Sequence, residues 1–432
     1  MGDIFTADEG IVEIGVEDVA FGTQSTNMSR VHQAKELPDR GNLKQAMHPS
    51  DRLRSGNHQE PGVLGHKSDS SVPLSVFLRG YKDGLPTAHP TLGSPLLLGG
   101  GSENEEIVAL AHAIGQIHVS GAGAALSAVE AAPAPTTTAF AVAVGKGADY
   151  EVGAHVAVEV SAGRYESRRV LTIAVDLLTL EYPLSAAPAA GKTVYSGIDI
   201  FPTQQPQVDA LSMNIQGQDN DGGDDWQHEL LGLCCNALGL KWDAQGFVEA
   251  NMEFDVEDWT REDAGTAPTY SADDGPERQA LLGAQFTMYL TGTPSCMDAS
   301  AMEFETGLNI QRPKSACAPQ GVLKSRFGLA EPVMTVDPYK EEEDTWMSST
   351  APFRNQDGVH FTFQAGSIPG RLVVLSISNG HVNEEPVLSE RDGMLINPIQ
   401  VVPMVYTGDG TPGTDERNNT TPKGAPWVLT IL

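Results

Sequence analysis

The chain has 432 residues, with 57 acidic and 27 basic side chains and a formal net charge of −30 at pH 7. This charge excludes adhesion to nucleic acid as a main function, because such affinity comes mainly from cationic side chains that neutralise phosphates. The chain also contains 45 glycines and 28 prolines, which favours many short strands and turns with helix in the minority.

Residues 1–139 are predicted to form an N-terminal arm and the first part of the main domain. Residues 1–72 show little periodicity, as expected of an extended arm or a long loop. Val72–Tyr81 is predicted to be a buried strand, and apolar residues recur at helical spacing in Glu105–Ile117. We therefore expect one helix beside a β-rich domain.

A small β-module is predicted at residues 140–195, inserted after the linker-like sequence AAPAPTTT at Ala131–Thr138. The main domain is then expected to resume over residues 196–432. The strands predicted from apolar periodicity are Ala154–Val160, Arg168–Val175, Leu177–Leu180, Val208–Ile215, Gly246–Trp259, Ala284–Leu290, Met302–Gln311, Val359–Gln364, Leu372–Ser378, Asn397–Tyr406 and Trp427–Leu432. The dipeptides Asn379-Gly380 and Asp409-Gly410 predict chain reversals.

Acidic and apolar residues alternate along two of these segments, Phe247–Glu257 and Met302–Gln311. A period of two indicates half-buried strands with the carboxylates on one face. Like charges that face each other across a sheet destabilise it by about 0.2–1 kcal/mol per pair, so stability does not explain such a surface. The candidate residues of this acidic face are Glu249, Glu253, Asp255, Glu257, Glu303 and Glu305.

Motifs for catalysis, cofactors or metals are missing, and no such site is predicted. The DNDGGDD sequence at Asp219–Asp225 lacks the glycine and glutamate of an EF-hand, which leaves a solvated turn or a weak cation site. Two suitably spaced carboxylates could hydrolyse glycosides. Acidic residues that alternate along strands are explained more simply as a charged surface, so we do not expect an enzyme. Adjacent Cys234 and Cys235 are interpreted as core residues, and pairing of Cys296 with Cys317 is left open.

The first 22 residues have no basic region followed by an apolar core, and no apolar run reaches the length of a membrane span. We therefore expect a protein that is made in a cytoplasm and at least initially stays there.

Several segments, taken in order, resemble the tail tube proteins of long-tailed bacteriophages. They are the opening GVEDVAFGTQ at Gly15–Gln24, the inserted unit that ends in AAGKTVY, the VDPY sequence at Val336–Tyr339, the RDG turn at Arg391–Gly393 and the terminal WVLTIL. The resemblance covers most of the chain as an order of weak motifs, and residues 25–71 have no match.

The resemblance implies a β-sandwich with a flanking helix, whose subunits form stacked, typically hexameric rings around a channel for DNA. It also implies a location in the virion tail after assembly in the host cytoplasm. The partners would be further copies of the chain and other tail proteins (tape measure, terminator and distal tail), with DNA passing without specific binding and no membrane contact. A channel wall of carboxylates would keep DNA mobile, so the acidic face is expected to line the lumen, and exposure to outer solvent is the alternative. Other β-rich virion components, such as capsid decoration or baseplate proteins, and less so a glycan hydrolase, stay as alternative functions.

Overall fold

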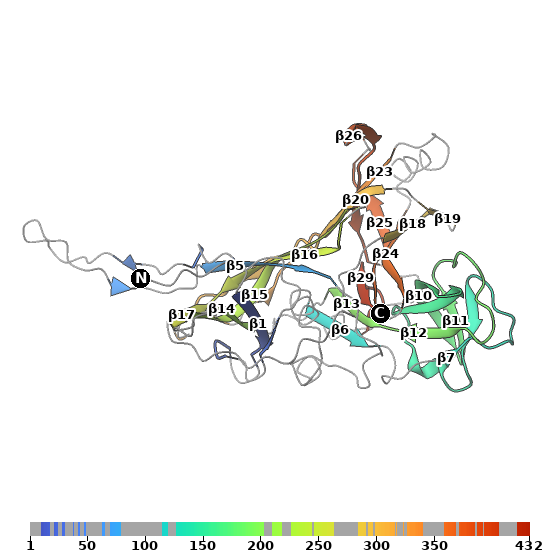
Figure 1. The fold of residues 1–432 in the computed structure, drawn as a ribbon, viewed down its shortest axis with the longest axis horizontal. Helices are drawn as coiled ribbons and strands as arrows, with labels where there is room; N and C mark the ends of the chain where they lie inside the picture. The colour runs from blue at the N-terminus through green and yellow to red at the C-terminus, as the bar shows by residue number, and fades with distance from the viewer. Residues whose placement is uncertain are drawn as a thin grey trace, which may run out of the picture.

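The protein is mainly β (Figure 1). The computed structural model describes residues 10–17, 21–24, 28–30, 38, 42–43, 47–48, 63–64, 70–78, 115–119, 127–202, 210–217, 226–243, 246–262, 284–290, 293–296, 299–315, 317, 323, 326–339, 358–368, 371–384, 387–391, 393–405 and 421–432. Within these ranges the helical structure is a three-residue 3-10 helix, Gly147–Asp149. No helix in the described residues is long and apolar enough to span a membrane.

The described strands form one large sheet, one six-stranded sheet and three two-stranded ribbons. The large sheet contains β1 (Gly10–Val16), β2 (Ser29–Arg30), β5 (Ser70–Phe77), β6 (Gly115–Val119), β13 (Ile198–Pro202), β14 (Leu211–Gly217), β15 (Trp226–Asp243), β16 (Glu249–Val256), β17 (Asp258–Glu262), β18 (Ala284–Leu290), β19 (Thr293–Cys296), β20 (Ala299–Glu305), β23 (Val333–Pro338), β24 (Val359–Ile368), β25 (Arg371–Val382), β28 (Ile399–Pro403) and β29 (Val428–Ile431). The six-stranded sheet contains β7 (Ser127–Ala128), β8 (Ala139–Ala141), β9 (His155–Ser161), β10 (Arg164–Ala174), β11 (Leu177–Leu180) and β12 (Thr193–Ser196). The ribbons are β3 (Met47–His48) with β4 (Val63–Leu64), β21 (Ile310–Gln311) with β22 (Arg326–Phe327), and β26 (Ser389–Arg391) with β27 (Met394–Ile396).

The large sheet folds over on itself into a sandwich of two layers. The first layer runs in the order β5-β16-β15-β20-β23-β28, and the second contains β18, β24, β25, β29, β13 and β6. Strand β25 joins the layers, because it pairs with β29 over its first half and with β28 at its end.

Alternation of apolar and polar residues builds the core between the layers. Met252 and Phe254 of β16 are buried with the inward side chains of the second layer in one continuous apolar cluster. Aromatic rings bridge the layers: Trp242 lies 5.2 Å from Phe363 between ring centroids. Burial of such side chains supplies most of the stability of a fold of this kind.

The six-stranded sheet, with its short helix, forms a separate unit that we call the module. It has its own apolar core, centred on Phe140, Val158 and Leu178. Its strands begin at Ser127, ahead of the position 140 suggested by the sequence, and the linker-like residues 131–138 lie inside it between β7 and β8. Figure 1 shows the module at one end of the molecule, beside β24 and β29.

Two local predictions are corrected by the structure, and one strand was missed. The C-terminal part of the predicted helix Glu105–Ile117 belongs to strand β6, which pairs with β13, and residues 105–114 lie outside the described part of the chain. Asn379-Gly380 does not form a turn, since β25 continues through it to Val382. The long strand β15 was not predicted, although it is the centre of the first layer.

Candidate functional site

The predicted acidic strand around residues 249–256 exists as β16, and its two faces differ in burial. Ala250, Met252 and Phe254 are buried in the core. Glu253 is exposed and Glu249 and Asp255 are half-buried on the opposite face of the strand. The pattern arises because successive side chains of a strand point to opposite sides of a sheet.

The second predicted acidic strand is shorter than expected. Strand β20 ends at Glu305, and Glu303 and Glu305 are exposed on the same outer face. Thr306 then turns toward β15, where both its backbone N–H and its hydroxyl donate to the carbonyl of Leu238 at 3.0 Å. Residues 310–311 form a separate ribbon with β22, so they do not continue the acidic face.

The two acidic strands are not neighbours, because β15 lies between them. Lys241 of β15 is directly opposite Glu249 on one side and Glu303 on the other. Two interstrand spacings, about 10 Å, therefore separate these carboxylates, a distance at which salt screens much of the repulsion between exposed charges. A cation in register between two anions also replaces like-charge contact with attraction.

Two residues away along β15, on the same face of the sheet, Gly239 takes the place of the lysine and Asn251 takes the place of one glutamate. Asn251, Gly239 and Glu305 are aligned across β16, β15 and β20. Because Gly239 has no side chain, the surface is hollowed there, and a concavity of about 410 Å³ is lined by residues that include Lys241, Glu253, Glu303 and Glu305. The acidic face is thus an open, shallow surface.

Asp255 lies at the margin of this face and has a basic partner. Its carboxylate is 3.3 Å from Nε of Arg312. Burial raises the pKa of Asp255, the Arg312 charge opposes that shift, and Glu253 adds to it. Asp255 is therefore a structural anchor for the segment after β21 more than a free surface charge.

Glu257 does not lie on the acidic face, which corrects the sequence-based prediction. It is only 3% exposed. The chain bends at this residue between β16 and β17, and its N–H donates to the carbonyl of Leu231, so the alternation that held over 249–256 no longer applies. Burial raises the pKa of Glu257 to about 7, with Arg312 opposing and Asp258 adding to the shift.

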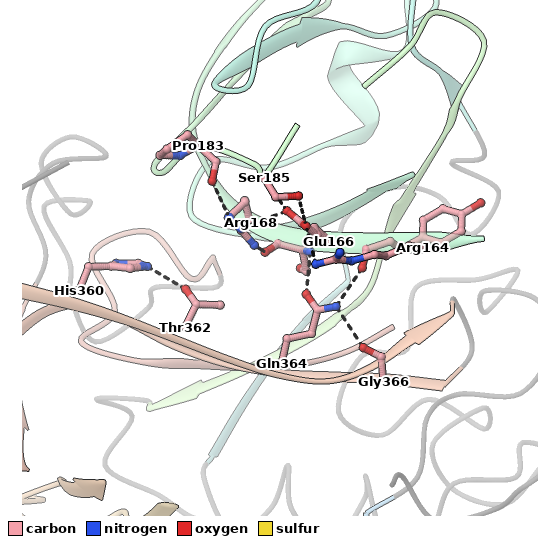
Figure 2. A network of polar contacts seen from close by, with 11 residues as sticks. Arg164, Glu166, Arg168, Pro183, Ser185, His360, Thr362, Gln364 and Gly366 are labelled. Atoms are coloured by element: carbon pink, nitrogen blue, oxygen red, sulfur yellow. Dashed lines mark hydrogen bonds and ion pairs between the residues drawn. The ribbon is translucent and has the colours of Figure 1, made fainter. Parts of the chain in front are cut away.

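The outer face of the second layer is covered, in contrast to the first. His360, Thr362 and Gln364 of β24 alternate with core residues and would face solvent, but the module buries all three. Figure 2 shows this region, where Gln364 accepts from the N–H of Ser167 at 3.0 Å and donates to the carbonyl of Tyr165 at 2.9 Å. Among the described residues, the outer face of the sandwich that stays exposed to solvent is therefore the acidic one.

Cysteines and metal-ligand types give no alternative site in the described residues. Cys234 and Cys235 are buried in the core as interpreted from the sequence, and Cys317 is a free thiol, so it is not paired with Cys296. No group of three or more His, Cys, Asp or Glu side chains in the described ranges is arranged to hold a metal ion. Residues 219–225, the possible weak cation site, lie outside the described part of the chain.

A scan against models of known protein families finds no match, and a search of curated proteins finds no relative. The resemblance to tail tube proteins therefore stays an expectation. One of its motifs has a clear structural role: the carboxylate of Glu17 accepts from the N–H groups of Gly22 and Gly232, each at 2.6 Å. This contact fixes the turn after β1 against β15, a role the sequence alone did not reveal.

Proposed function

We propose that the chain is a structural virion protein that assembles into stacked rings, forming a phage tail tube with an acidic channel for DNA. The observation that carries the proposal is the exposed face of β16, β15 and β20, where Glu253, Glu303 and Glu305 surround a shallow concavity. This face is the outer surface of the first layer, which the module does not cover.

The charge of this face suits passage of DNA better than its capture. A basic surface would hold phosphates through release of counterions, and an acidic one would not. Lys241 lowers the repulsion inside the sheet, while the four carboxylates at 249, 253, 303 and 305 keep the face anionic. A stable sheet can in this way present net negative charge to a channel.

Sheet edges provide one route to self-assembly. Within the described residues, β5 pairs with β16 over its full length, and assembly by edge pairing would extend this sheet with a strand from a further copy. Pro73 lies in β5 with its side chain exposed, and proline in a sheet is confined to edges because it lacks an N–H donor. A closed ring of paired strands leaves no sheet edge exposed.

A projecting ribbon provides a second contact. Strands β26 and β27 form the tip of a projection in Figure 1, and four large apolar side chains there are exposed: Val387, Leu388, Met394 and Leu395. The ribbon is joined to the rest of the fold through the bridge between Ile396 and Tyr339, and exposed apolar patches such as this one mark interaction surfaces. We assign this ribbon to contacts between copies of the chain.

Negative-stain imaging of the purified full-length chain tests the proposal. Hollow tubes with a regular axial repeat are expected over a range of protein concentration and salt. Monomers under all conditions tested would contradict self-assembly, and solid or closed particles would favour a capsid decoration or baseplate protein instead.

A further inference from the structure

The junction between the module and the sandwich is unusually polar for a buried contact. Strands β9 and β10 of the module lie against β24, β25 and β29 of the second layer, and the small apolar part of the contact includes Tyr165, Val374 and Leu432. Around it are two arginines, three carboxylates and two histidines, all buried or nearly so. These are Arg168, Arg169, Glu166, Glu181, Asp199, His155 and His360.

The arginines are held by many acceptors. Arg169 donates to Ser378 at 2.7 Å and to the carbonyls of Pro422 and Ala425 at 2.7 and 3.2 Å. Arg168 donates to Glu166 at 3.3 Å and to the carbonyl of Pro183 at 3.1 Å (Figure 2). The two guanidinium groups impose a fixed positive field on the junction.

His360 is enclosed on β24 by groups from three directions. Its Nε2 lies 2.8 Å from Oγ1 of Thr362, and its ring stacks on Tyr182 with 3.7 Å between centroids. Glu181 is 3.8 Å from Nδ1. Burial lowers the pKa of His360 well below its usual value, and the charges of Arg168, Arg169 and His155 lower it further.

His155 occupies the other side of the same junction, on β9. Its Nδ1 is 2.7 Å from Oγ1 of Thr430, and that hydroxyl donates to Asp199 at 2.6 Å. Thr430 therefore accepts from His155, which assigns the ring proton to Nδ1. Burial lowers the pKa of His155, Asp199 opposes the shift, and Arg169 and Arg168 add to it.

We propose that this junction is a pH-sensitive contact, which protonation of His155 and His360 opens, freeing the module from the outer face of β24, β25 and β29. Arg164 also lies 3.3 Å from Glu166, so with neutral histidines three arginines balance the three carboxylates among the described groups of the junction. Protonation of both rings would leave two net positive charges in a place shielded from water, where unbalanced charge is costly. The module and the sandwich keep separate cores, so the junction can open without global unfolding.

The direction of the pH effect follows from the histidines. In the open state they take up protons near pH 6.5, whereas in the closed state they do so only at lower pH. As the pH falls below 6.5, the open state therefore binds more protons than the closed state, and the equilibrium shifts toward the open state. Each histidine should raise the opening constant by about tenfold per pH unit within that window.

Hydrogen exchange of the full-length chain at about pH 7.5, 6 and 5, corrected for intrinsic rates, tests this. The amides of Ser167 and His155, which donate across the junction to Gln364 and Asp199, should lose protection as the pH falls, while those of 139–142 and 249–256 should not. The double variant His155→Asn/His360→Gln, which keeps hydrogen-bonding groups but cannot titrate, should remove the pH dependence. His381→Gln, on β25 outside the junction, is the matched control and should behave as wild type.

Junction protection that is unchanged down to about pH 5 in the wild type would overturn the proposal. If the double variant does not fold, the ring titrations of the wild type, followed by NMR, replace it. Both rings should then take up protons only where the junction amides begin to exchange. Rings that titrate near 6.5 while those amides stay protected would also overturn it.

Discussion

Lys241 of β15 lies directly opposite Glu303 of β20 in an antiparallel ladder. The same lysine is opposite Glu249 on its other side. An acidic sheet can thus be stable because its anions are spaced by a strand that carries a cation and small residues. The net charge of the exposed face stays negative, as the proposed channel for DNA requires.

Replacement of Lys241 should weaken the first layer. Lys241→Gln removes the cation between two carboxylates, and we expect a loss of about 0.5 kcal/mol in the free energy of unfolding, since exposed pairs contribute little individually. The loss should shrink at high salt. Urea denaturation at two salt concentrations measures it, with exposed Lys314→Gln as the control. An equal loss in both variants would contradict the role assigned to Lys241.

Glu257 should make the protein less stable as the pH rises. Its pKa is about 7 in the folded chain against 4.5 in the reference state, so between these values the folded state holds a proton that the unfolded state has lost. Glu257→Gln should therefore match the wild type near pH 4.5 and exceed its stability above pH 7 by at least about 1 kcal/mol.

Urea midpoints across this pH range measure the difference, and exposed Glu384→Gln serves as the control. A stability difference between Glu257→Gln and wild type that does not vary with pH would show that the Glu257 carboxyl is not buried.

Gly380 is needed for space within β25. A Cβ atom there would lie 2.3 Å from Cγ1 of Val401 on β28. Gly380→Ala should therefore cost about 1–3 kcal/mol through overpacking. Val401→Ala should recover part of that loss in the double variant, which a double-mutant cycle of urea unfolding would reveal. Gly246→Ala, where a Cβ meets nothing closer than 3.5 Å, is the control.

The projecting ribbon should be required for assembly and not for folding. Met394 and Leu395 are 57% and 50% exposed, so Met394→Asp/Leu395→Asp should change the stability of the single chain by no more than about 0.5 kcal/mol. Tubes should disappear in sedimentation and negative stain. Val144→Asp, at a 92% exposed position on the module, should leave them intact. Normal tubes from the double variant would remove the ribbon from the assembly contacts.

Strands with one buried face and one solvent-exposed face were predictable from the sequence. Strand β16 and the exposed positions of Glu253 and Glu303 follow from a period of two, which reports burial directly. Strand β15 was missed because its alternation changes phase at an irregularity between Cys235 and Ala237, so the segment looks apolar on both faces.

Other features depend on contacts that local sequence does not encode. Glu257 is an even number of residues from Glu253, so strand alternation places it on the acidic face. The chain bends at Glu257, and its side chain is buried instead. Gly380 follows an asparagine, as in tight turns, yet it serves close packing against Val401. The polar residues His360 and Gln364 match a solvent-facing pattern, and only the position of the module shows that they are buried.

A three-dimensional reconstruction of tubes assembled from the full-length chain tests the central claim most directly. We predict that Glu253, Glu303 and Glu305 lie on the wall of the bore, with the module on the side of the sandwich away from it. Tubes in which these three carboxylates face outward, or are buried between subunits, would contradict the proposed acidic channel.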